Sequence, residues 1–361
     1  MPKILFAGGG TGGSVSPLLA LREALAKIYT NDELEFVWIG TPSGPEKILV
    51  RSQGIEFHWI FSGKLRRYFS WRNFVDPWLV LFGIVQSFFL LRRIKPDAIV
   101  SAGSFVAVPV AIAAWFLRVP ILIHQQDIKP GLANKIIARL AKKITVSFAE
   151  TAKAFPQSKV VVSGNPVRPE ILLGSKDKAM SLFGLSPNLP TVLVIGGGTG
   201  ALQLNKLVVG ALPELLQFCQ VVHITGKGKK LPPLALKDKA EFYHAYEFVA
   251  DGLPDLLAAA DLVISRAGLG FLTELSALGK PAMVIPIPNS HQEDNAEYFA
   301  KHGAVLYAKQ NLLSSQGLVS DVKNLLSDKE SLDFLGKKIR SMFRPQAADI
   351  IAYEISQMIN V

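Results

Sequence analysis

Residues 3–13, KILFAGGGTGG, recur in the second half of the chain as residues 191–201, TVLVIGGGTGA. In each copy a short apolar run is followed by a glycine cluster and then by an amphipathic stretch, Leu18–Ile28 or Leu202–Leu216. This order predicts a strand, a tight turn and a helix, twice. The two glycine clusters lie about half the chain apart, so each half is expected to open its own Rossmann-like unit.

Further strand candidates alternate with helical patterns along both halves. They are ELEFVWIG (33–40), DAIVSAG (97–103), ILIHQ (121–125), ITVSF (144–148), VVHITG (221–226), AYEFVA (245–250), DLVISRAG (261–268) and AMVIPIP (282–288). Such alternation is typical of parallel sheets covered by helices.

We therefore expect an α/β fold of two Rossmann-like domains that face each other across a cleft. The expected domains are residues 1–165 and 166–345, with the linker somewhere in 163–187, where a polar stretch breaks the pattern. A final helix at 346–361 is apolar on one face and could pack on either domain, which would bring the chain back to the first.

The composition excludes a disordered chain, because 49% of the residues are hydrophobic and 19% are charged. The single cysteine, Cys219, fits a reducing compartment, and the start of the chain does not resemble an export signal. A net charge of +10 favours an anionic partner: a nucleic acid, acidic lipid headgroups or a phosphorylated substrate. No helix-turn-helix, zinc or RNP pattern is present, so no nucleic-acid partner is expected.

An 18-residue apolar run, 74–91, lies between basic residues and raises the question of a membrane span. Asp76, Pro77, Gly83 and Gln86 interrupt it, so we favour a helix in the membrane interface over a spanning one, with an ordinary buried helix as the alternative. The expected position is peripheral, on the cytoplasmic face of the cell membrane. The residues expected at the anionic membrane surface are Lys64, Arg66, Arg67, Trp71, Phe74, Trp78, Phe82 and Trp115.

Both glycine clusters fit phosphate binding, since glycines let main-chain amides approach a diphosphate and the following helix start adds a favourable dipole. A dinucleotide enzyme would carry an acid where the second strand ends, but residues 38–41 read WIGT. Neither cluster is followed by Lys-Ser or Lys-Thr, which disfavours a P-loop. A tight turn without any ligand remains the alternative.

A third constellation, RAGLGFLTE at 266–274, follows a strand and enters a helix. Its small residues expose amides at a helix start, and Glu274 could accept hydrogen bonds from both hydroxyls of a ribose. The polar stretch PIPNSHQEDN, 286–295, is rich in amides able to bind sugar hydroxyls. These features indicate a nucleotide-sugar site in the second half.

Eight ordered segments together resemble the MurG family of glycosyltransferases. They are GGGTGG with Pro17, SAGSFVAVP (101–109), IHQQD with Gly131 and Asn134, SGNPVR (163–168), IGGGTGALQLN, HITGKG (223–228), RAGLGFLTE and HQEDNA. The resemblance implies a GT-B fold and inverting transfer of N-acetylglucosamine from UDP-N-acetylglucosamine to undecaprenyl-pyrophosphoryl-N-acetylmuramyl-pentapeptide, the step from lipid I to lipid II in peptidoglycan synthesis. It implies neither a metal nor a cofactor.

The resemblance also implies roles for individual residues. Glu274 would hold the ribose, the backbone at Val249 the uracil, and Arg168 the nucleotide. The amides and sugar contacts would come from Gly198, Thr199, Gly200, Gly268, Leu269, Gly270, Gln292 and Asn295. On the acceptor side the implied residues are Thr11, Gly12, Gly13 and Asn134.

The acceptor half departs from the family pattern at the positions of its proposed base. Ser14 stands where the family has histidine, and residues 124–127 read HQQD in place of HEQN. Our hypothesis is that Asp127 acts as the general base. The alternatives are that Asp127 only caps a helix, or that His124 is the base; Ser14, in the histidine's place, also remains a catalytic candidate.

Three rival functions follow from the same features. A related glycosyltransferase could act on another lipid-linked acceptor, because the altered positions belong to the acceptor loop. An epimerase of similar build would need an array of acids and histidines around the sugar, which the sequence lacks. A basic, non-enzymatic binder of membranes or nucleic acids would explain the charge but not the glycine clusters.

Overall fold

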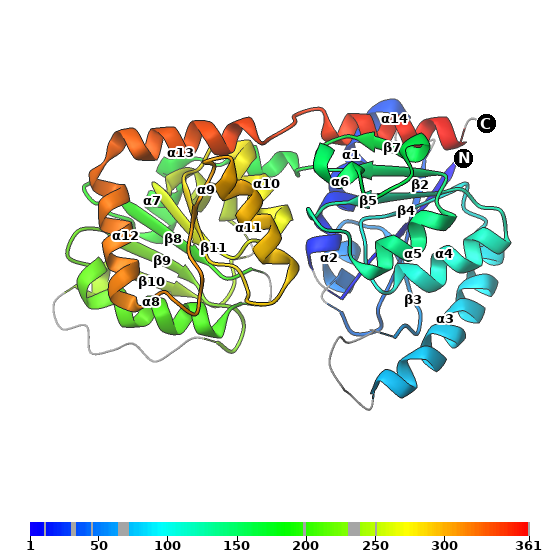
Figure 1. The fold of residues 1–361 in the computed structure, drawn as a ribbon, viewed down its shortest axis with the longest axis horizontal. Helices are drawn as coiled ribbons and strands as arrows, with labels where there is room; N and C mark the ends of the chain where they lie inside the picture. The colour runs from blue at the N-terminus through cyan, green and yellow to red at the C-terminus, as the bar shows by residue number, and fades with distance from the viewer. Residues whose placement is uncertain are drawn as a thin grey trace. The chain divides into compact units, whose positions relative to one another are not determined.

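A computed structural model of the chain describes residues 1–10, 12–29, 34–44, 46–63, 72–197, 200–229, 239–249 and 251–359, without the side chains of 72–74. The chain divides into two compact units: residues 1–167 with 344–361, and residues 168–343. Each unit is a parallel sheet with helices on both faces (Figure 1). The predicted α/β class is therefore confirmed.

The first unit is built on a seven-stranded sheet of order β3-β2-β1-β4-β5-β6-β7. Its strands are β1 (Lys3–Ala7), β2 (Glu35–Gly40), β3 (Glu56–Trp59), β4 (Ala98–Ser101), β5 (Ile121–Gln125), β6 (Lys143–Val146) and β7 (Val160–Val162). Its helices are η1 (Gly12–Ser14), α1 (Ser16–Ile28), α2 (Glu46–Ser52), α3 (Arg72–Ile94), α4 (Ala107–Phe116), α5 (Leu132–Leu140), α6 (Ala149–Ala152), η3 (Gln157–Lys159) and α14 (Ala347–Ile359).

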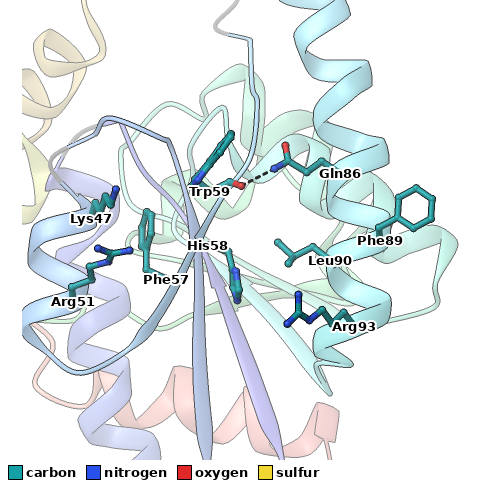
Figure 2. Close-up of a pocket in the computed structure, with 9 residues that line it drawn as sticks. All are labelled: Lys47, Arg51, Phe57, His58, Trp59, Gln86, Phe89, Leu90 and Arg93. Atoms are coloured by element: carbon teal, nitrogen blue, oxygen red, sulfur yellow. Dashed lines mark hydrogen bonds between the residues drawn. The ribbon is translucent and has the colours of Figure 1, made fainter.

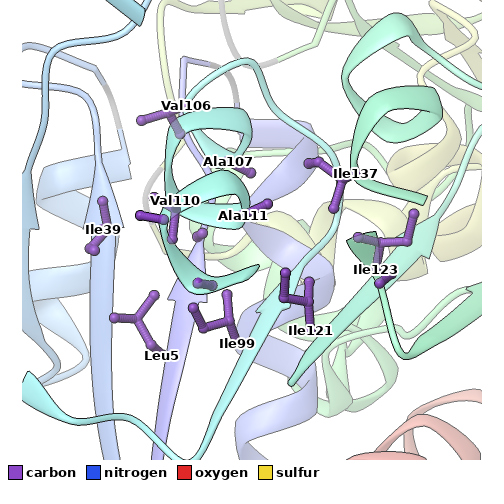
Figure 3. Close-up of a cluster of buried hydrophobic side chains, with 14 of the residues drawn as sticks. Leu5, Ile39, Ile99, Val106, Ala107, Val110, Ala111, Ile121, Ile123 and Ile137 are labelled. Atoms are coloured by element: carbon purple, nitrogen blue, oxygen red, sulfur yellow. The ribbon is translucent and has the colours of Figure 1, made fainter. Parts of the chain in front are cut away.

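Alternating residues of the central strand fill the two cores of this unit. Leu5 packs with Ile99 and with Val110 of α4 on one face of the sheet, as Figure 3 shows. Its neighbours Ile4 and Phe6 pack on the other face, with α1 and α14. Because both faces are covered, the central strands β1 (KILFA) and β4 (AIVS) are nearly continuous apolar runs, as is typical of parallel sheets.

The second unit has a six-stranded sheet of order β10-β9-β8-β11-β12-β13. Its strands are β8 (Thr191–Ile195), β9 (Gln220–Ile224), β10 (Tyr243–Tyr246), β11 (Leu262–Ser265), β12 (Ala282–Val284) and β13 (Leu306–Tyr307). Its helices are η4 (Pro169–Leu173), α7 (Lys176–Phe183), α8 (Leu202–Leu215), η5 (Ala240–Phe242), α9 (Leu253–Ala259), α10 (Leu269–Leu278), α11 (His291–Lys301), α12 (Ser315–Ser327) and α13 (Lys329–Ser341).

The C-terminal helix α14 belongs to the first unit, although the second unit precedes it in the chain. Ile351 and Ile355 are fully buried in the core that α1 lines, and Glu354 pairs with Lys143 of β6 at 2.8 Å. In Figure 1 this helix is drawn in red beside α1. The polar stretch in 163–187 contains η4 and α7, both within the second unit.

Both sheets reverse their strand order beside their first strand, between β1 and β4 and between β8 and β11. Ligands of doubly wound sheets bind at the carboxyl ends of the strands at such a reversal. A glycine cluster follows β1 in the first unit and β8 in the second. Each unit therefore presents one candidate site at its own switch point.

Candidate active site

Side chains from three other segments of the first unit hold the glycine loop after β1. Trp38 donates from Nε1 to the Gly8 carbonyl at 2.8 Å, and Ser104 donates from Oγ to the Gly9 carbonyl at 2.8 Å. Gly10 has a φ of +83°, where an added Cβ would lie 2.7 Å from the Phe105 ring. These contacts therefore fix the main chain of residues 8–10, and Gly10 must be glycine.

The carboxylate of Glu46 lies directly beneath this loop and is fully buried. Its Oε2 accepts from the Gly10 amide at 3.1 Å, and its Oε1 accepts from both the amide and the hydroxyl of Thr41. A Cβ on Gly9 would lie 2.2 Å from Glu46 Oε1. The Gly10 amide thus serves the loop's own structure, and Glu46 is a site residue that sequence reasoning missed.

Amide side chains gather where β5 ends. Asn134 donates from Nδ2 to Gln125 Oε1 at 2.6 Å, and Gln125 donates from Nε2 to the Asp127 carbonyl at 2.8 Å. Asn134 is buried, and its Oδ1 accepts no hydrogen bond from the described residues. The side chain of Gln125 therefore links the side chain of Asn134 to the main chain of half-buried Asp127.

His124 is fully buried, and both of its ring nitrogens contact neighbours inside the unit. Nδ1 lies 3.0 Å from Thr145 Oγ1, and Nε2 lies 2.9 Å from Asn165 Oδ1. Burial lowers the pKa of His124 to about 4, although the Asn165 contact opposes this. His124 is thus a neutral structural residue that would have to leave its partners to accept a proton. Ser14, the other alternative, is buried at the end of η1, while Gly13 is exposed.

The glycine loop after β8 also requires glycine. Gly197 and Gly200 have φ values of 90° and 70°. The Gly200 amide donates to the Gly197 carbonyl at 2.8 Å, and a Cβ on Gly200 would lie 2.4 Å from the Thr225 carbonyl. Lys229 donates from Nζ to the Gly200 carbonyl at 3.1 Å, which brings a cation to the start of α8.

Glu274 on α10 and Arg168, which precedes η4, form an ion pair of 3.3 Å within the second unit. Glu274 is only 8% exposed, and burial raises its pKa above the ordinary value, while Arg168 opposes that shift through its charge and hydrogen bond. The Nε of Arg168 is buried and donates to no acceptor among the described residues. A carboxylate and a guanidinium with spare bonding capacity are therefore held together, as a ribose and a diphosphate would require.

Two buried side chains shape the turn from β11 into α10. Arg266 donates from Nη1 to the Ile285 carbonyl at 2.8 Å and from Nη2 to Gln310. Asn295, fully buried, donates from Nδ2 to the Ala267 carbonyl at 3.1 Å. Together they hold Gly268, the N-cap of α10. Direct contact between Asn295 and a sugar would require its side chain to leave this position.

The remaining predicted donor residues are more accessible. Gln292 is half-buried and accepts from the Ile287 amide at 3.1 Å through Oε1. Gly270 and Val249 are half-buried, and Leu269 is buried in the first turn of α10. The predicted site residues outside the described part of the chain are Thr11, Gly198, Thr199, Lys64, Arg66, Arg67, Trp71 and the side chain of Phe74.

Helix α3 exposes a continuous apolar stripe on the first unit. It consists of Val75, Trp78, Leu81, Phe82, Val85 and Phe89, each more than half exposed. Trp115 and Phe116, also exposed, end the neighbouring helix α4. Large exposed apolar patches of this kind mark interaction surfaces.

Residues 75–94 of α3 are long and apolar enough to cross a membrane, with a mean hydropathy of 1.4 and 22% of that window buried. The opposite side of α3 nevertheless packs against the core of the first unit. Leu91 and Ile94 lie in the core, and Gln86 bonds to Trp59 and Phe61 beside β3. Insertion as a span would break these contacts.

Within the described residues, no three histidine, cysteine, aspartate or glutamate side chains are placed to hold a metal ion.

Sequence comparison identifies both halves of the chain. The pattern of the glycosyltransferase family 28 N-terminal domain matches residues 4–146, and that of the family 28 C-terminal domain matches residues 191–351. A UDP-N-acetylglucosamine--N-acetylmuramyl-(pentapeptide) pyrophosphoryl-undecaprenol N-acetylglucosamine transferase of Bacillus thuringiensis is 41% identical. The match covers 99% of this chain and 100% of that protein.

Solved structures agree with this similarity. The crystal structure of Acinetobacter baumannii MurG superposes with a TM-score of 0.75 at 25% identity, covering 99% of this chain and 100% of that one. A UDP-GlcNAc 2-epimerase from Neisseria meningitidis bound to UDP-GlcNAc has a TM-score of 0.70 at 14% identity, covering 98% and 100%. The second likeness shows a common fold only.

Proposed function

Because this chain belongs to the MurG transferases of glycosyltransferase family 28, we propose that it transfers N-acetylglucosamine from UDP-N-acetylglucosamine to undecaprenyl-pyrophosphoryl-N-acetylmuramyl-pentapeptide. The observation that carries this function is 41% identity over essentially the full length of a transferase with that activity in its name. The reaction converts lipid I into lipid II for peptidoglycan synthesis.

The second unit binds the donor in this proposal. Glu274 accepts hydrogen bonds from the ribose hydroxyls, and Arg168 approaches the diphosphate with an Nε that donates to none of the described residues. Amides at Gly198 and Thr199 and at the start of α10 stabilise the charge that develops on the departing UDP, while the Gly200 amide holds the loop through the Gly197 carbonyl. Gln292 contacts the sugar, the backbone at Val249 contacts the uracil, and Asn295 supports the turn before α10.

The first unit binds the acceptor, and Asp127 is its general base. The acceptor hydroxyl attacks the anomeric carbon of the donor, its proton passes to the Asp127 carboxylate, and UDP leaves from the opposite face, which inverts the configuration. The amide network at the end of β5 supports this role, because Gln125 holds the Asp127 main chain and the Asn134 Oδ1 accepts no hydrogen bond from the described part of the chain. The loop that contains Gly12 and exposed Gly13 faces the lipid pyrophosphate in this proposal.

The first unit docks on the cytoplasmic face of the cell membrane through the apolar stripe of α3. Trp78 and Phe82 are 63% and 65% exposed, and Arg92, Arg93 and Lys95 follow at the end of the helix. Exposed aromatic side chains beside basic ones are typical of helices that lie in an anionic interface. Docking there brings the first unit to its membrane-bound acceptor.

The experiment combines purified protein, UDP-N-acetylglucosamine and a short-chain muramyl-pentapeptide pyrophosphoryl lipid, and follows UDP release. We expect release only when both substrates are present, with an acceptor product heavier by one N-acetylhexosamine. UDP release that does not depend on the acceptor, or the absence of release, would contradict the proposal.

A further inference from the structure

A cavity of about 530 Å³ opens on the first unit between α2, the edge strand β3 and α3 (Figure 2). Lys47 and Arg51 reach it from α2, and Arg93 reaches it from α3. Gln86 fixes one wall, because it donates from Nε2 to the Trp59 carbonyl at 2.9 Å and accepts from the Phe61 amide at 3.0 Å. Neither the glycine loop nor Asp127 lines the cavity, and the proposed transfer reaction does not use it.

Positive charge dominates the lining of this cavity. Lys47, Arg51 and Arg93 all line it, and no acidic residue is among its described lining residues. Over the described ranges of the chain, none of these three side chains forms an ion pair with a carboxylate. Uncompensated arginine and lysine around a hollow of this size favour an anion, and phosphate suits both side chains.

Apart from Gln86 and His58, whose Nε2 lies 2.8 Å from the Glu56 carboxylate, the rest of the wall is apolar. It continues onto the stripe of α3. Phe57, Trp59, Phe89 and Leu90 line the cavity, and Phe89, 66% exposed, is also the last residue of the stripe. A soluble phosphate ester would satisfy the cations and leave these aromatic surfaces in water. A phospholipid satisfies both, because its phosphate pairs with the cations and its chains lie along the stripe.

We propose that this cavity binds the headgroup phosphate of one anionic phospholipid. The proposal rests on the membrane docking proposed above and deepens it, since it replaces diffuse attraction with one saturable site. A lipid held between α2 and α3 also fixes the orientation of the first unit relative to the bilayer.

The test compares two charge-matched double variants. Arg51→Gln with Arg93→Gln removes two cations of the cavity, whereas Arg92→Gln with Lys95→Gln removes two exposed cations from the same end of α3 that do not line it. Non-specific electrostatic attraction to an anionic membrane raises the partition coefficient about fivefold for each basic side chain near the membrane surface, whatever its position on the protein. In co-sedimentation with phosphatidylglycerol vesicles, we expect the cavity pair to lose at least about tenfold more partition than the control pair. Vesicles of phosphatidylcholine should not distinguish the pairs.

A second measurement separates a lipid site from a site for free phosphate. Monomeric dihexanoyl-phosphatidylglycerol, titrated into the wild-type protein and followed by ³¹P NMR, should saturate one site that the cavity pair lacks. Glycerol 3-phosphate, which has the phosphate without the chains, should bind at least about tenfold more weakly, since burial of each methylene contributes about 0.8 kcal/mol.

Equal losses for the two double variants would overturn the cavity and leave membrane docking intact. Equal binding of glycerol phosphate and the short-chain lipid would also overturn it, in favour of a soluble phosphate. Failure of the wild-type protein to bind phosphatidylglycerol vesicles would remove the docking on which the proposal rests. UDP release with the short-chain acceptor, measured on the same protein, reports separately on the transferase function.

Discussion

Asp127 is the residue on which the chemical step depends in our proposal. Its main chain is fixed by Gln125 at the end of β5, whereas the nearby His124 is buried with both ring nitrogens in contact with neighbours. We expect Asp127→Asn to lower kcat by about two orders of magnitude or more, as loss of a general base does. The KM for UDP-N-acetylglucosamine should stay unchanged.

Ser14→Ala is the matched control for that substitution, because Ser14 occupies the place of the family's histidine. Its kcat should change by less than about threefold, since removal of a non-catalytic hydroxyl does not touch proton transfer. Steady-state kinetics on both variants decide the assignment. Full activity in Asp127→Asn would remove this residue from the mechanism.

Glu274 should control donor affinity and its dependence on pH. Hydrogen bonds to a charged group contribute about 1.5–3 kcal/mol, so Glu274→Gln should raise the KM for the donor by roughly ten- to a hundredfold. Burial raises the pKa of Glu274. When the solution is acidified, the Glu274 carboxylate of the free enzyme is therefore protonated at a higher pH than the carboxylate of an ordinary glutamate.

Wild-type donor affinity should therefore weaken as the pH falls toward this raised pKa, and recover above it. The Gln variant should show little such dependence. Isothermal titration of both proteins with the donor UDP-N-acetylglucosamine between pH 5 and 8 measures both curves, because the diphosphate of the intact donor does not titrate in this range, unlike the terminal phosphate of UDP. A wild-type curve as flat as the variant's would show that Glu274 does not accept the ribose hydroxyls.

The first glycine loop is the element whose structure the sequence describes least well. Its glycines predict amides turned toward a phosphate, but the Gly10 amide donates to buried Glu46. Glu46 comes from α2, more than thirty residues later in the chain, so no local pattern connects the two. By contrast, Glu274 and the start of α10 lie within one local motif, which is why they could be recognised directly.

Glu46→Gln should loosen that loop. Both oxygens of Glu46 accept from main-chain N–H groups, of Gly10 and of Thr41, and the NH₂ group of glutamine would place a donor against one of these donors. An unsatisfied buried donor costs about 1–3 kcal/mol. We expect a rise of about tenfold in the KM for the acceptor and no change in the KM for the donor. Glu56→Gln, at an exposed glutamate on β3, is the control. Equal changes in both KM values would indicate general destabilisation rather than positioning of the loop.

The exposed stripe of α3 should contribute to membrane binding and little to the unfolding free energy of the protein. Trp78→Ser with Phe82→Ser should lower partition onto phosphatidylglycerol vesicles by about tenfold or more, since each side chain contributes apolar burial in the interface. The unfolding free energy should change by less than about 0.5 kcal/mol, as for other surface substitutions. Leu173→Ser, at a residue of the second unit that is 77% exposed, should change neither quantity. Unaltered vesicle binding in the double variant would exclude the stripe as the docking surface.

At the scale of the whole molecule, the repeat of strand, glycine turn and helix was sufficient to predict two parallel α/β units. The short edge strands β3, β7 and β13 were not predicted, because they have two to four residues and no clear alternation. The strand predicted at 245–250 begins earlier, at Tyr243. The placement of α14 required the structure, since its apolar face fits either unit in principle and only packing against α1 decides.

Because the chain returns to the first unit at α14, the stability of that unit depends on this last helix. Ile355 is fully buried against α1, so Ile355→Ala should destabilise the first unit by about 2–5 kcal/mol. Tyr353→Ala, at a residue of the same helix that is 57% exposed, should cost less than about 0.5 kcal/mol. Hydrogen exchange should show lost protection in β1 and α1 with Ile355→Ala, and unchanged protection in β8 and α8. Equal loss in both units would contradict the independence of the two cores.

The transfer reaction itself is best tested by following the anomeric carbon of the donor. UDP-N-acetylglucosamine labelled with ¹³C at C1 is incubated with the short-chain muramyl-pentapeptide pyrophosphoryl lipid and the protein, and the label is followed by NMR. We expect the α signal of the donor to be replaced by one β-linked signal attached to the muramyl sugar, with one UDP released for each bond formed. Label in an α linkage, in free N-acetylglucosamine or in an epimerised UDP-sugar would contradict it.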